Sequence, residues 1–154
     1  MRKTVLSKTV LSGAIVEAMS MGMAAQAMAK DSVFVGHLAD LSGPTAFVGK
    51  YYADGVRDSL SYINANGGID GTKLEYETID YAYKVPQAIG AYKKWKSRKK
   101  MVAMQGWGTA DTEALISFAA RDKLPVFSAS YSGHLTDPTG KNPKTKKPAP
   151  YNFF

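Results

Sequence analysis

Hydrophobic and polar residues alternate along residues 32–154 with two different periods. Short, almost continuous apolar runs are typical of strands buried on both faces of a parallel sheet, and they lie at 33–38, 100–106, 124–127 and 151–154. In one further segment, 74–78, apolar residues alternate with Glu75 and Glu77, which indicates a strand with one wetter face.

Between these runs, apolar residues recur at the three- and four-residue spacing of helices. The first helix has its stripe at Tyr52, Val56, Leu60 and Ile63, and 66–68 (Asn-Gly-Gly) ends it because glycine adopts the left-handed conformation without strain. Pro86 opens a second helix, 86–99, with its stripe at Ala88, Ala91, Tyr92 and Trp95. Thr109 or Asp111 is expected to cap a third, with its stripe at Ala114, Leu115, Phe118 and Ala119.

The order of these elements predicts an α/β fold, a parallel sheet with helices on both faces in three αβα layers. In such sheets ligands bind beyond the carboxyl ends of the strands, where the strand order reverses. The loops that follow the strands are therefore the places to look for a site. Residues 132–149 are rich in Gly, Pro, Thr and Lys and are expected to form an exposed loop.

The composition fits one globular domain with a positive charge. The chain has 154 residues, 45% of them hydrophobic, a net charge of +7 and a pI of about 9.5, so an acidic partner must be considered. It has no cysteine. That excludes disulfides, thiolate metal sites, a cysteine nucleophile and a lipid-modified N-terminal cysteine.

The first 29 residues have the pattern of a secretory signal peptide. A basic start is followed by an apolar stretch, about 10–25, and by Ala-x-Ala sites at 25–27 and 27–29, which predict cleavage after Ala27 or Ala29. Glu17 interrupts the apolar stretch, and an amphipathic N-terminal helix is the alternative. No later segment is apolar for long enough to span a bilayer, so we expect no stable membrane insertion after cleavage.

The remaining positive charge is concentrated in KKWKSRKK, residues 93–100. Removing 1–29 takes away three basic residues and one acidic residue, which leaves 17 basic residues, 12 acidic residues and a net charge of +5; six of the basic residues lie in this run. In a helix Trp95 points toward the sheet while Lys93, Lys94 and Lys96 face water. A solvated helix face is the favoured interpretation and a docking surface for an acidic partner the alternative; no nucleic acid is expected.

Patterns for catalysis, metals and cofactors are weak. His37 and His134 have no carboxylate at ligand spacing, so no metal is predicted. Gly106-Trp107-Gly108 begins like a dinucleotide fingerprint, but Asp111 stands where the third glycine belongs, so no cofactor is predicted. A secreted hydrolase using Ser130, His134 and Asp137 remains an alternative, although these residues are also common in turns.

Three loops after strands share small hydroxyls and free backbone N–H groups: 42–46, 107–110 and 128–132. Two of them lead into helix N-termini, where N–H groups and the helix dipole favour an anion such as a carboxylate. The alternative is that Thr109 only caps its helix and the serines only turn the chain.

The motifs in these loops resemble a known family. Leu-Ser-Gly-Pro at 41–44 and Ile-Asn-Ala-Asn-Gly-Gly-Ile-Asp-Gly at 63–71 are followed by Asp80, by Pro-Gln-Ala at 86–88 and by Gly-Trp-Gly-Thr-Ala-Asp-Thr at 106–112. Leu-Pro-Val-Phe-Ser at 124–128 and Leu-Thr-Asp-Pro at 135–138 complete the pattern. Residues 32–154 are thus similar to type I periplasmic binding proteins, in particular to the leucine/isoleucine/valine-binding receptors of ABC importers.

The resemblance implies a two-lobed receptor that closes on a small solute and hands it to a membrane permease, without catalysis or cofactor. It places first-lobe ligand contacts at Gly108, Thr109, Ser130 and Ser132, with 42–48 at the cleft edge. The predicted ligand-binding residues are Ser42, Thr45, Trp107, Gly108, Thr109, Ser130, Tyr131 and Ser132.

Four departures from the family pattern bear on these expectations. Val48, preceded by Phe47, stands where amino-acid-binding members often have an aromatic residue, Trp107 adds bulk beside Gly108, and the cysteine pair of some members is missing. The solute is therefore left open among a branched-chain amino acid, an amide, a urea-like compound and an aromatic carboxylate. Family members are more than twice as long, so residues 30–154 are expected to be the N-terminal lobe of a truncated chain. Such a lobe is expected to be only marginally stable alone. A ligand-sensing domain that acts on a signalling partner is a further functional alternative.

Overall fold

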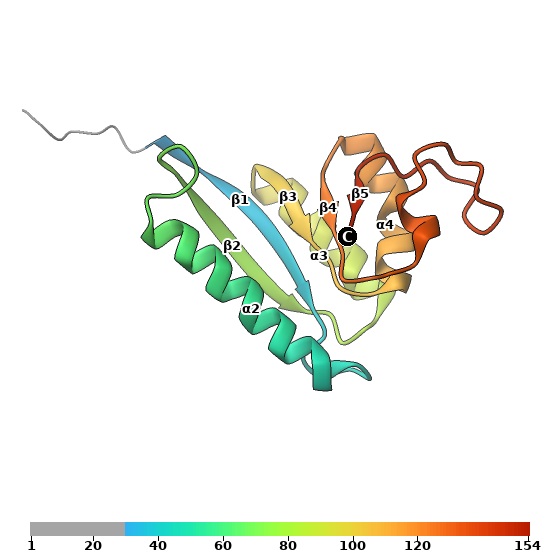
Figure 1. The fold of residues 1–154 in the computed structure, drawn as a ribbon, viewed down its shortest axis with the longest axis horizontal. Helices are drawn as coiled ribbons and strands as arrows, with labels where there is room; N and C mark the ends of the chain where they lie inside the picture. Colours follow the sequence, from blue (N-terminus) through green and yellow to red (C-terminus); the bar gives the residue numbers. More distant parts are fainter. Residues whose placement is uncertain (1–29) are drawn as a thin grey trace, which may run out of the picture.

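The protein folds around a five-stranded parallel sheet (Figure 1). The computed structural model describes residues 30–154. The strands are β1 (Lys30–Ala39), β2 (Thr72–Asp80), β3 (Met101–Gln105), β4 (Val126–Phe127) and β5 (Asn152–Phe153). Their order in space is β2-β1-β3-β4-β5, and every neighbouring pair is parallel. The order reverses between β1 and β3, so a ligand site is expected at the carboxyl ends of these two strands.

Three helices cover the sheet. Helix α2 (Ala46–Ala65) packs on β1 and β2, while α3 (Val85–Arg98) and α4 (Thr109–Asp122) lie together on the other face (Figure 1). The predicted α/β fold with helices on both faces is confirmed. Helix α2 ends as predicted, because Gly67 and Gly68 adopt positive φ values of 99° and 84°.

The third predicted helix differs from its expectation in two details. Its N-cap is Gly108, so Thr109 is the first helical residue and does not cap the helix; the Asp111 carboxylate instead accepts from the Gly108 N–H. Its inner stripe is rotated relative to the prediction, because Thr112 and Ile116 are fully buried whereas Ala114 and Phe118 are partly exposed. The helix therefore turns a partly polar first turn toward the sheet.

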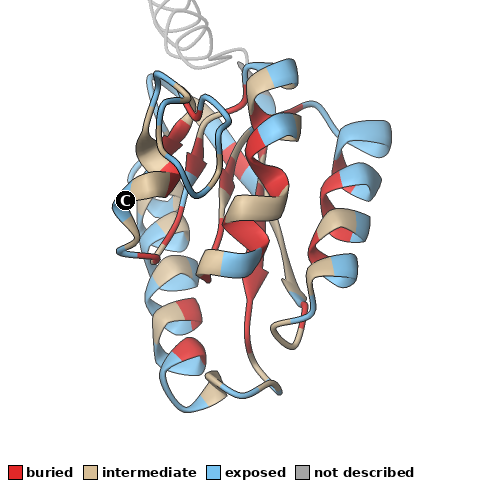
Figure 2. Ribbon diagram, turned by 90° about the vertical axis from the view of Figure 1, so that its right-hand side faces the viewer, coloured by how far each residue is buried: buried red, intermediate tan, exposed pale blue. Residues whose placement is uncertain are grey.

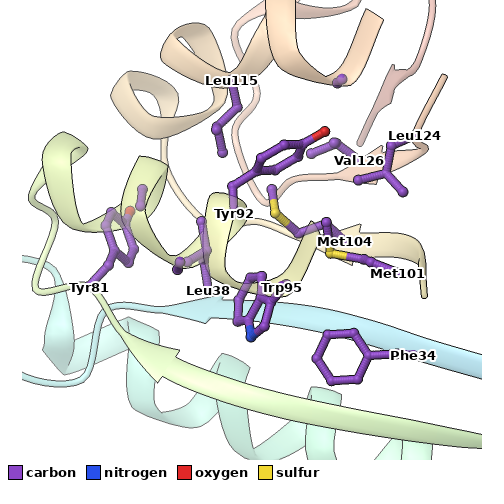
Figure 3. Close-up of a cluster of buried hydrophobic side chains, with 13 residues drawn as sticks. Phe34, Leu38, Tyr81, Tyr92, Trp95, Met101, Met104, Leu115, Leu124 and Val126 are labelled. Carbon is purple, nitrogen blue, oxygen red and sulfur yellow. The ribbon is translucent and has the colours of Figure 1, made fainter. Parts of the chain in front are cut away.

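The main core lies between the sheet and helices α3 and α4 (Figure 3). Trp95 is 1% exposed; its ring centroid lies 6.1 Å from that of Phe34, and its indole N–H donates to Glu77. Gly36 on β1 lies directly under this ring, and a Cβ placed on Gly36 would be 2.6 Å from Trp95 Cζ3. The absence of a side chain at Gly36 is therefore what lets the indole approach β1 so closely.

The basic run 93–100 is the outer face and end of α3, as predicted. All six basic residues of the run are exposed, and Lys94 pairs with Glu77 while Lys99 lies 3.6 Å from Glu75. Because these carboxylates project from the wetter face of β2 toward α3, part of the positive charge of the run is compensated by ion pairs within the molecule. This arrangement is a solvated helix face.

Among the described residues, no helix covers the part of the sheet that lies beside α2 on the same face. The stripe of α2 at Tyr52, Val56, Leu60 and Ile63 is only half-buried. Beyond it, Val102, Phe127 and Phe153 are 39%, 45% and 44% exposed, and the two phenylalanine rings stack on each other with their centroids 5.5 Å apart. Figure 2 shows that buried residues gather on the central strands and on the inner sides of the helices. This face of the sheet therefore exposes apolar side chains beside α2.

The segment 132–149 is less open than its composition predicts. It contains a 3-10 helix, η1 (Gly133–Thr136), and it buries Leu135 and Ala149 against Ile116 of α4. The expectation of a wholly exposed loop is thus wrong at these two positions, because two apolar residues in a polar segment suffice to anchor it. Within residues 30–154 no helix is long and apolar enough to cross a membrane, and the expected signal peptide, 1–29, lies outside the described residues.

Candidate functional site

A cavity of about 520 Å³ opens at the carboxyl ends of the strands, where the sheet order reverses. The loops after β1, β2, β3 and β4 all contribute to it, together with the first two turns of α2 and the first turn of α4. It is lined by Thr45, Phe47, Val48, Tyr52, Tyr83, Trp107, Gly108, Thr109, Ala129, Ser130, Tyr131 and Ser132. We call it the cleft. None of these twelve residues carries a formal charge at neutral pH, and five of them are aromatic.

Three hydroxyl groups meet on one wall of the cleft. Thr109 Oγ1 lies 2.8 Å from Ser130 Oγ and 3.3 Å from Ser132 Oγ. Ser130 is 4% exposed and Thr109 is the first residue of α4, so the cluster sits at the positive end of the helix dipole. Each hydroxyl can rotate to donate or to accept, and the cluster can therefore present donors to an anion.

A buried carboxylate lies behind this cluster. Asp111 is 1% exposed; it accepts from the Gly108 N–H at 3.1 Å and from the Tyr81 hydroxyl at 2.7 Å. Burial raises the pKa of the Asp111 carboxyl, and the hydrogen bond from Tyr81 opposes that rise. Asp111 satisfies backbone donors that face the interior, and it does not line the cleft.

A second buried carboxylate organises the loop after β1. Asp40 is fully buried and accepts from the N–H groups of Gly43 and Thr45 at 2.6 and 2.8 Å and from the Thr45 hydroxyl at 2.5 Å. Thr45 Oγ1 in turn accepts from the indole N–H of Trp107 at 2.8 Å. The loops after β1 and β3 are thus joined through one threonine hydroxyl.

Trp107 is held from a second side by Tyr52 of α2. The two ring centroids are 5.1 Å apart with the planes tilted by 53°. The Tyr52 hydroxyl accepts from the side-chain amide of Gln105, at the end of β3, and burial raises the Tyr52 pKa. The sequence pattern assigned Tyr52 only to the buried stripe of its helix, so its place in the cleft was missed.

Tyr83 is the other residue that the sequence reasoning missed. It follows β2, and both Ala82 and Tyr83 adopt left-handed φ values, 50° and 57°. This turn lays the Tyr83 ring on Gly108, where an added Cβ would lie 2.5 Å from the ring. Non-glycine residues with such φ values cluster at ligand sites because the surrounding structure must hold the strain. The loop after β2 was the one post-strand loop without small hydroxyls, which is why it escaped notice.

The cleft brings together seven of the eight residues predicted to bind a ligand. These are Thr45, Trp107, Gly108, Thr109, Ser130, Tyr131 and Ser132. Ser42 lies apart from it, since it is exposed and its hydroxyl donates to Asp80 at 2.6 Å. Of the expected cleft edge, 42–48, the cleft lining includes Thr45, Phe47 and Val48.

The three residues of the possible hydrolase triad do not meet. Ser130 Oγ bonds to Thr109, whereas His134 Nε2 lies 3.5 Å from Glu113. The Asp137 carboxylate accepts from Thr139 and from the Asn142 N–H within its own loop. In the part of the chain that the structure describes, the side chains bonded to Ser130 Oγ include no base, so none of them activates this hydroxyl. Among residues 30–154 there is also no group of three His, Asp or Glu side chains that could hold a metal ion.

Comparison with known proteins identifies the family of the chain. A sequence profile described as periplasmic binding protein matches residues 32–154. The chain belongs to the periplasmic binding protein family. The match includes every residue that lines the cleft, so the post-strand loops identified above belong to the family domain.

Individual periplasmic binding proteins agree with this assignment. The leucine-specific-binding protein of Salmonella typhimurium is 36% identical over 88 residues, which are 57% of this chain and 22% of the relative. The substrate binding protein of an ABC transporter from Aeropyrum pernix shares 34% identity and a TM-score of 0.69 over 80% of this chain. The branched-chain amino acid transporter substrate binding protein LivJ of Streptococcus pneumoniae, solved with isoleucine, shares 25% identity and a TM-score of 0.63 over 68% of this chain.

The chain spans 30% of the Aeropyrum protein and 31% of the Streptococcus protein. The similarity to all three proteins therefore concerns a minor part of their length.

Proposed function

We propose that this protein is the solute-binding component of an ABC-type importer, and that the cleft is the first-lobe half of its solute site. The observation that carries the proposal is the cluster of Thr109, Ser130 and Ser132 hydroxyls at the N-terminus of α4. The cluster lies in the cleft of a chain that belongs to the periplasmic binding protein family. The names of the relatives, which include a leucine-specific-binding protein, support the same role.

In this proposal a carboxylate of the solute binds at the hydroxyl cluster. The hydroxyls of Thr109 and Ser130 rotate to donate to it, and the partial positive charge at the start of α4 attracts it. The Gly108 N–H already donates to Asp111, so the hydroxyls of the cluster, which can rotate, are the groups that would donate to the solute. Recognition of this kind needs no formal positive charge, which agrees with the uncharged lining.

The apolar part of the solute would lie against the opposite, aromatic side of the cleft. A branched-chain amino acid or a related small amide or carboxylate fits a cavity of about 520 Å³ with this combination of hydroxyls and rings. A second lobe that closes over the cleft would remove the solute from water, and affinity for the single lobe should be correspondingly lower.

The proposed role is binding without catalysis. After cleavage of an N-terminal signal, the protein would act in the periplasm and deliver its solute to a membrane permease. The basic run at 93–100 lies on the outer face of α3, away from the cleft residues, and it takes no part in this proposal.

The test is a titration followed by ¹⁵N NMR on the 154-residue chain, with L-leucine, L-isoleucine and benzoate as carboxylate probes. We expect at least one probe to shift the backbone signals of 108–110 and 128–132. Thr109→Val and Ser130→Ala should each weaken binding roughly three- to tenfold, the worth of one hydrogen bond. Ser97→Ala, which removes an exposed hydroxyl of α3, is the matched control and should bind like the parent.

Two results would overturn the proposal. One is that no carboxylate probe moves these signals at millimolar concentration. The other is ester or amide hydrolysis that is abolished by Ser130→Ala, because a receptor that only binds its solute has no turnover to lose.

A further inference from the structure

We propose that Trp107 is the specificity-determining wall of the cleft, that Thr45 is the residue that positions it, and that the wall selects a solute with a flat aromatic ring and a carboxylate over a branched aliphatic amino acid. This inference rests on the proposed function, since it names the class of solute for the same cleft. Four observations lead to it.

The first observation is that the Trp107 side chain is fixed in place. Its indole N–H donates to Thr45 Oγ1 at 2.8 Å, and its ring packs against Tyr52 with the centroids 5.1 Å apart. Its backbone carbonyl accepts from Ser128 Oγ at 3.4 Å. The indole, held by a hydrogen bond and a ring contact, forms a preformed surface, which lowers the entropic cost of binding a rigid ligand.

The second observation concerns the Thr45 hydroxyl. It donates to Asp40 at 2.5 Å and accepts from Trp107 at 2.8 Å, so its one proton and one of its lone pairs are in use. Asp40 is fully buried and is itself held by two backbone N–H groups. Thr45 was predicted to bind the solute directly. The two hydrogen bonds of its hydroxyl instead make Thr45 a positioning residue, which links the fixed carboxylate of Asp40 to the Trp107 indole.

The third observation is the shape of the remaining walls. Tyr83 is pressed on Gly108 by a strained turn and is stacked on Tyr81, with ring centroids 5.9 Å apart. Including Trp107, five of the twelve lining residues are aromatic, and the aliphatic side chains among the twelve are those of Val48 and Ala129. Flat, rigid walls suit a flat ligand. One good ring-to-ring contact favours an aromatic solute by up to about tenfold beyond the area it buries.

The fourth observation is the uncharged lining of the cleft. An α-amino acid carries an ammonium group as well as a carboxylate, and a buried ammonium is costly without an acceptor of opposite charge. Asp40, Asp80 and Asp111 all lie outside the cleft lining, and each accepts hydrogen bonds from groups of the chain itself. An aromatic carboxylate has no ammonium group, so the hydroxyl cluster and the rings meet all of its needs in this half of the site.

The two tryptophans make the test direct. Trp107 Nε1–H bonds to Thr45 in the cleft wall, whereas Trp95 Nε1–H bonds to Glu77 on the far side of the core, so the Trp95 indole signal is an internal reference. The ¹⁵N-labelled 154-residue chain is titrated with benzoate and with L-leucine, and with L-phenylalanine to separate the ring from the ammonium group. We expect benzoate to shift the Trp107 indole signal without moving that of Trp95, and to bind about tenfold more tightly than L-leucine.

Variants then separate positioning from packing. Trp107→Leu should lose the preference for benzoate, and Trp107→Phe should retain part of it because a ring remains. Thr45→Val keeps the volume but breaks both hydrogen bonds, so the preference should fall at least several-fold and the Trp107 indole signal should move even without ligand. Thr45→Ser keeps the hydroxyl and should restore both to the parent values. Unfolding curves of each variant identify any loss of binding that comes only from misfolding. If a Thr45 variant misfolds, the comparison of Trp107→Leu with Trp107→Phe tests whether the wall sets the preference for benzoate.

The possible failures are distinguishable. If L-leucine binds as tightly as benzoate or more tightly, the aromatic class is wrong while the cleft remains a solute site. If Thr45→Val keeps the full preference, Thr45 does not position the wall. If no probe moves any cleft signal, the proposed function itself fails.

Discussion

Gly36 and Trp95 allow a quantitative test of the core through a double-mutant cycle. Gly36→Ala places a Cβ under the indole, 2.6 Å from Trp95 Cζ3, with Met101 Sδ 3.0 Å away. Overpacking of this kind in a tight core costs about 1–3 kcal/mol of unfolding free energy. Trp95→Ala removes a ring that is 1% exposed and should cost about 3–5 kcal/mol.

The informative quantity is the double variant. Once the indole is gone, the Cβ at Gly36 meets mainly the flexible Met101 side chain, and alanine also reduces the entropy of the unfolded chain. Gly36→Ala should then be neutral or stabilising in the Trp95→Ala background, so the two effects are non-additive by about 1–3 kcal/mol.

Urea unfolding followed by circular dichroism measures each variant. With a slope of roughly 2 kcal/mol per molar urea, the Gly36→Ala change moves the midpoint down by about 0.5–1.5 M. Gly90→Ala, in the interior of α3 with nothing within 4 Å of an added Cβ, is the control and should raise stability by about 0.5–1 kcal/mol. Additive effects within about 0.5 kcal/mol would refute the packing of Trp95 on Gly36.

Three further predictions concern pH, the cleft and the basic run. Burial, together with the positive charge of Arg57, lowers the pKa of His37 to about 4. As the pH drops from 6.5 to 4 the unfolded chain takes up a proton before the folded one, so the free energy of unfolding should fall by up to about 3 kcal/mol. His37→Gln should flatten this part of a plot of urea midpoint against pH, and an unchanged curve would contradict the burial of His37. Gly108→Ala should abolish solute binding in the NMR titration, because the new Cβ would lie 2.5 Å from the Tyr83 ring. Adding Tyr83→Ala should restore the space and, because Trp107 is unchanged, retain a preference for the aromatic probe. Lys93→Glu with Lys94→Glu should leave solute affinity unchanged, since both side chains are exposed on α3 outside the cleft; a tenfold loss would place the basic run in the site.

Most of the secondary structure could be predicted from the sequence because its signals are local. The apolar run at 33–38 belongs to β1, Pro86 lies in the first turn of α3, and the glycines at 67–68 end α2. Each signal is a period or a backbone preference that acts within a few residues. The wrong choice of a cap for α4 has the same origin. Thr109 and Asp111 are less than one helical turn apart, so the local pattern could not show which of them accepts the hydrogen bond from the Gly108 N–H.

The site was predicted in part because the rule for parallel sheets is general. Loops that follow strands converge at the switch point, and hydroxyls in those loops, at Thr109 and Ser130, were identified from sequence. Tyr52 and Tyr83 were not, because one was explained as a core stripe and the other lies in a loop without hydroxyls. Ser42 has the residue type for binding, yet its hydroxyl bonds to Asp80.

The sequence by itself determined the α/β architecture, the family motifs and the hydroxyls of the cleft, since periodicity and turn chemistry are properties of neighbouring residues. Only the tertiary structure decided what each group does. Thr45 and Trp107 are 62 positions apart, and their hydrogen bond exists because β1 and β3 are adjacent at the point where the sheet order reverses. The Thr45 hydroxyl could have bound a solute, but it bonds to the Trp107 indole instead. That bond depends on which strands are neighbours in the sheet, and no local sequence pattern contains this information.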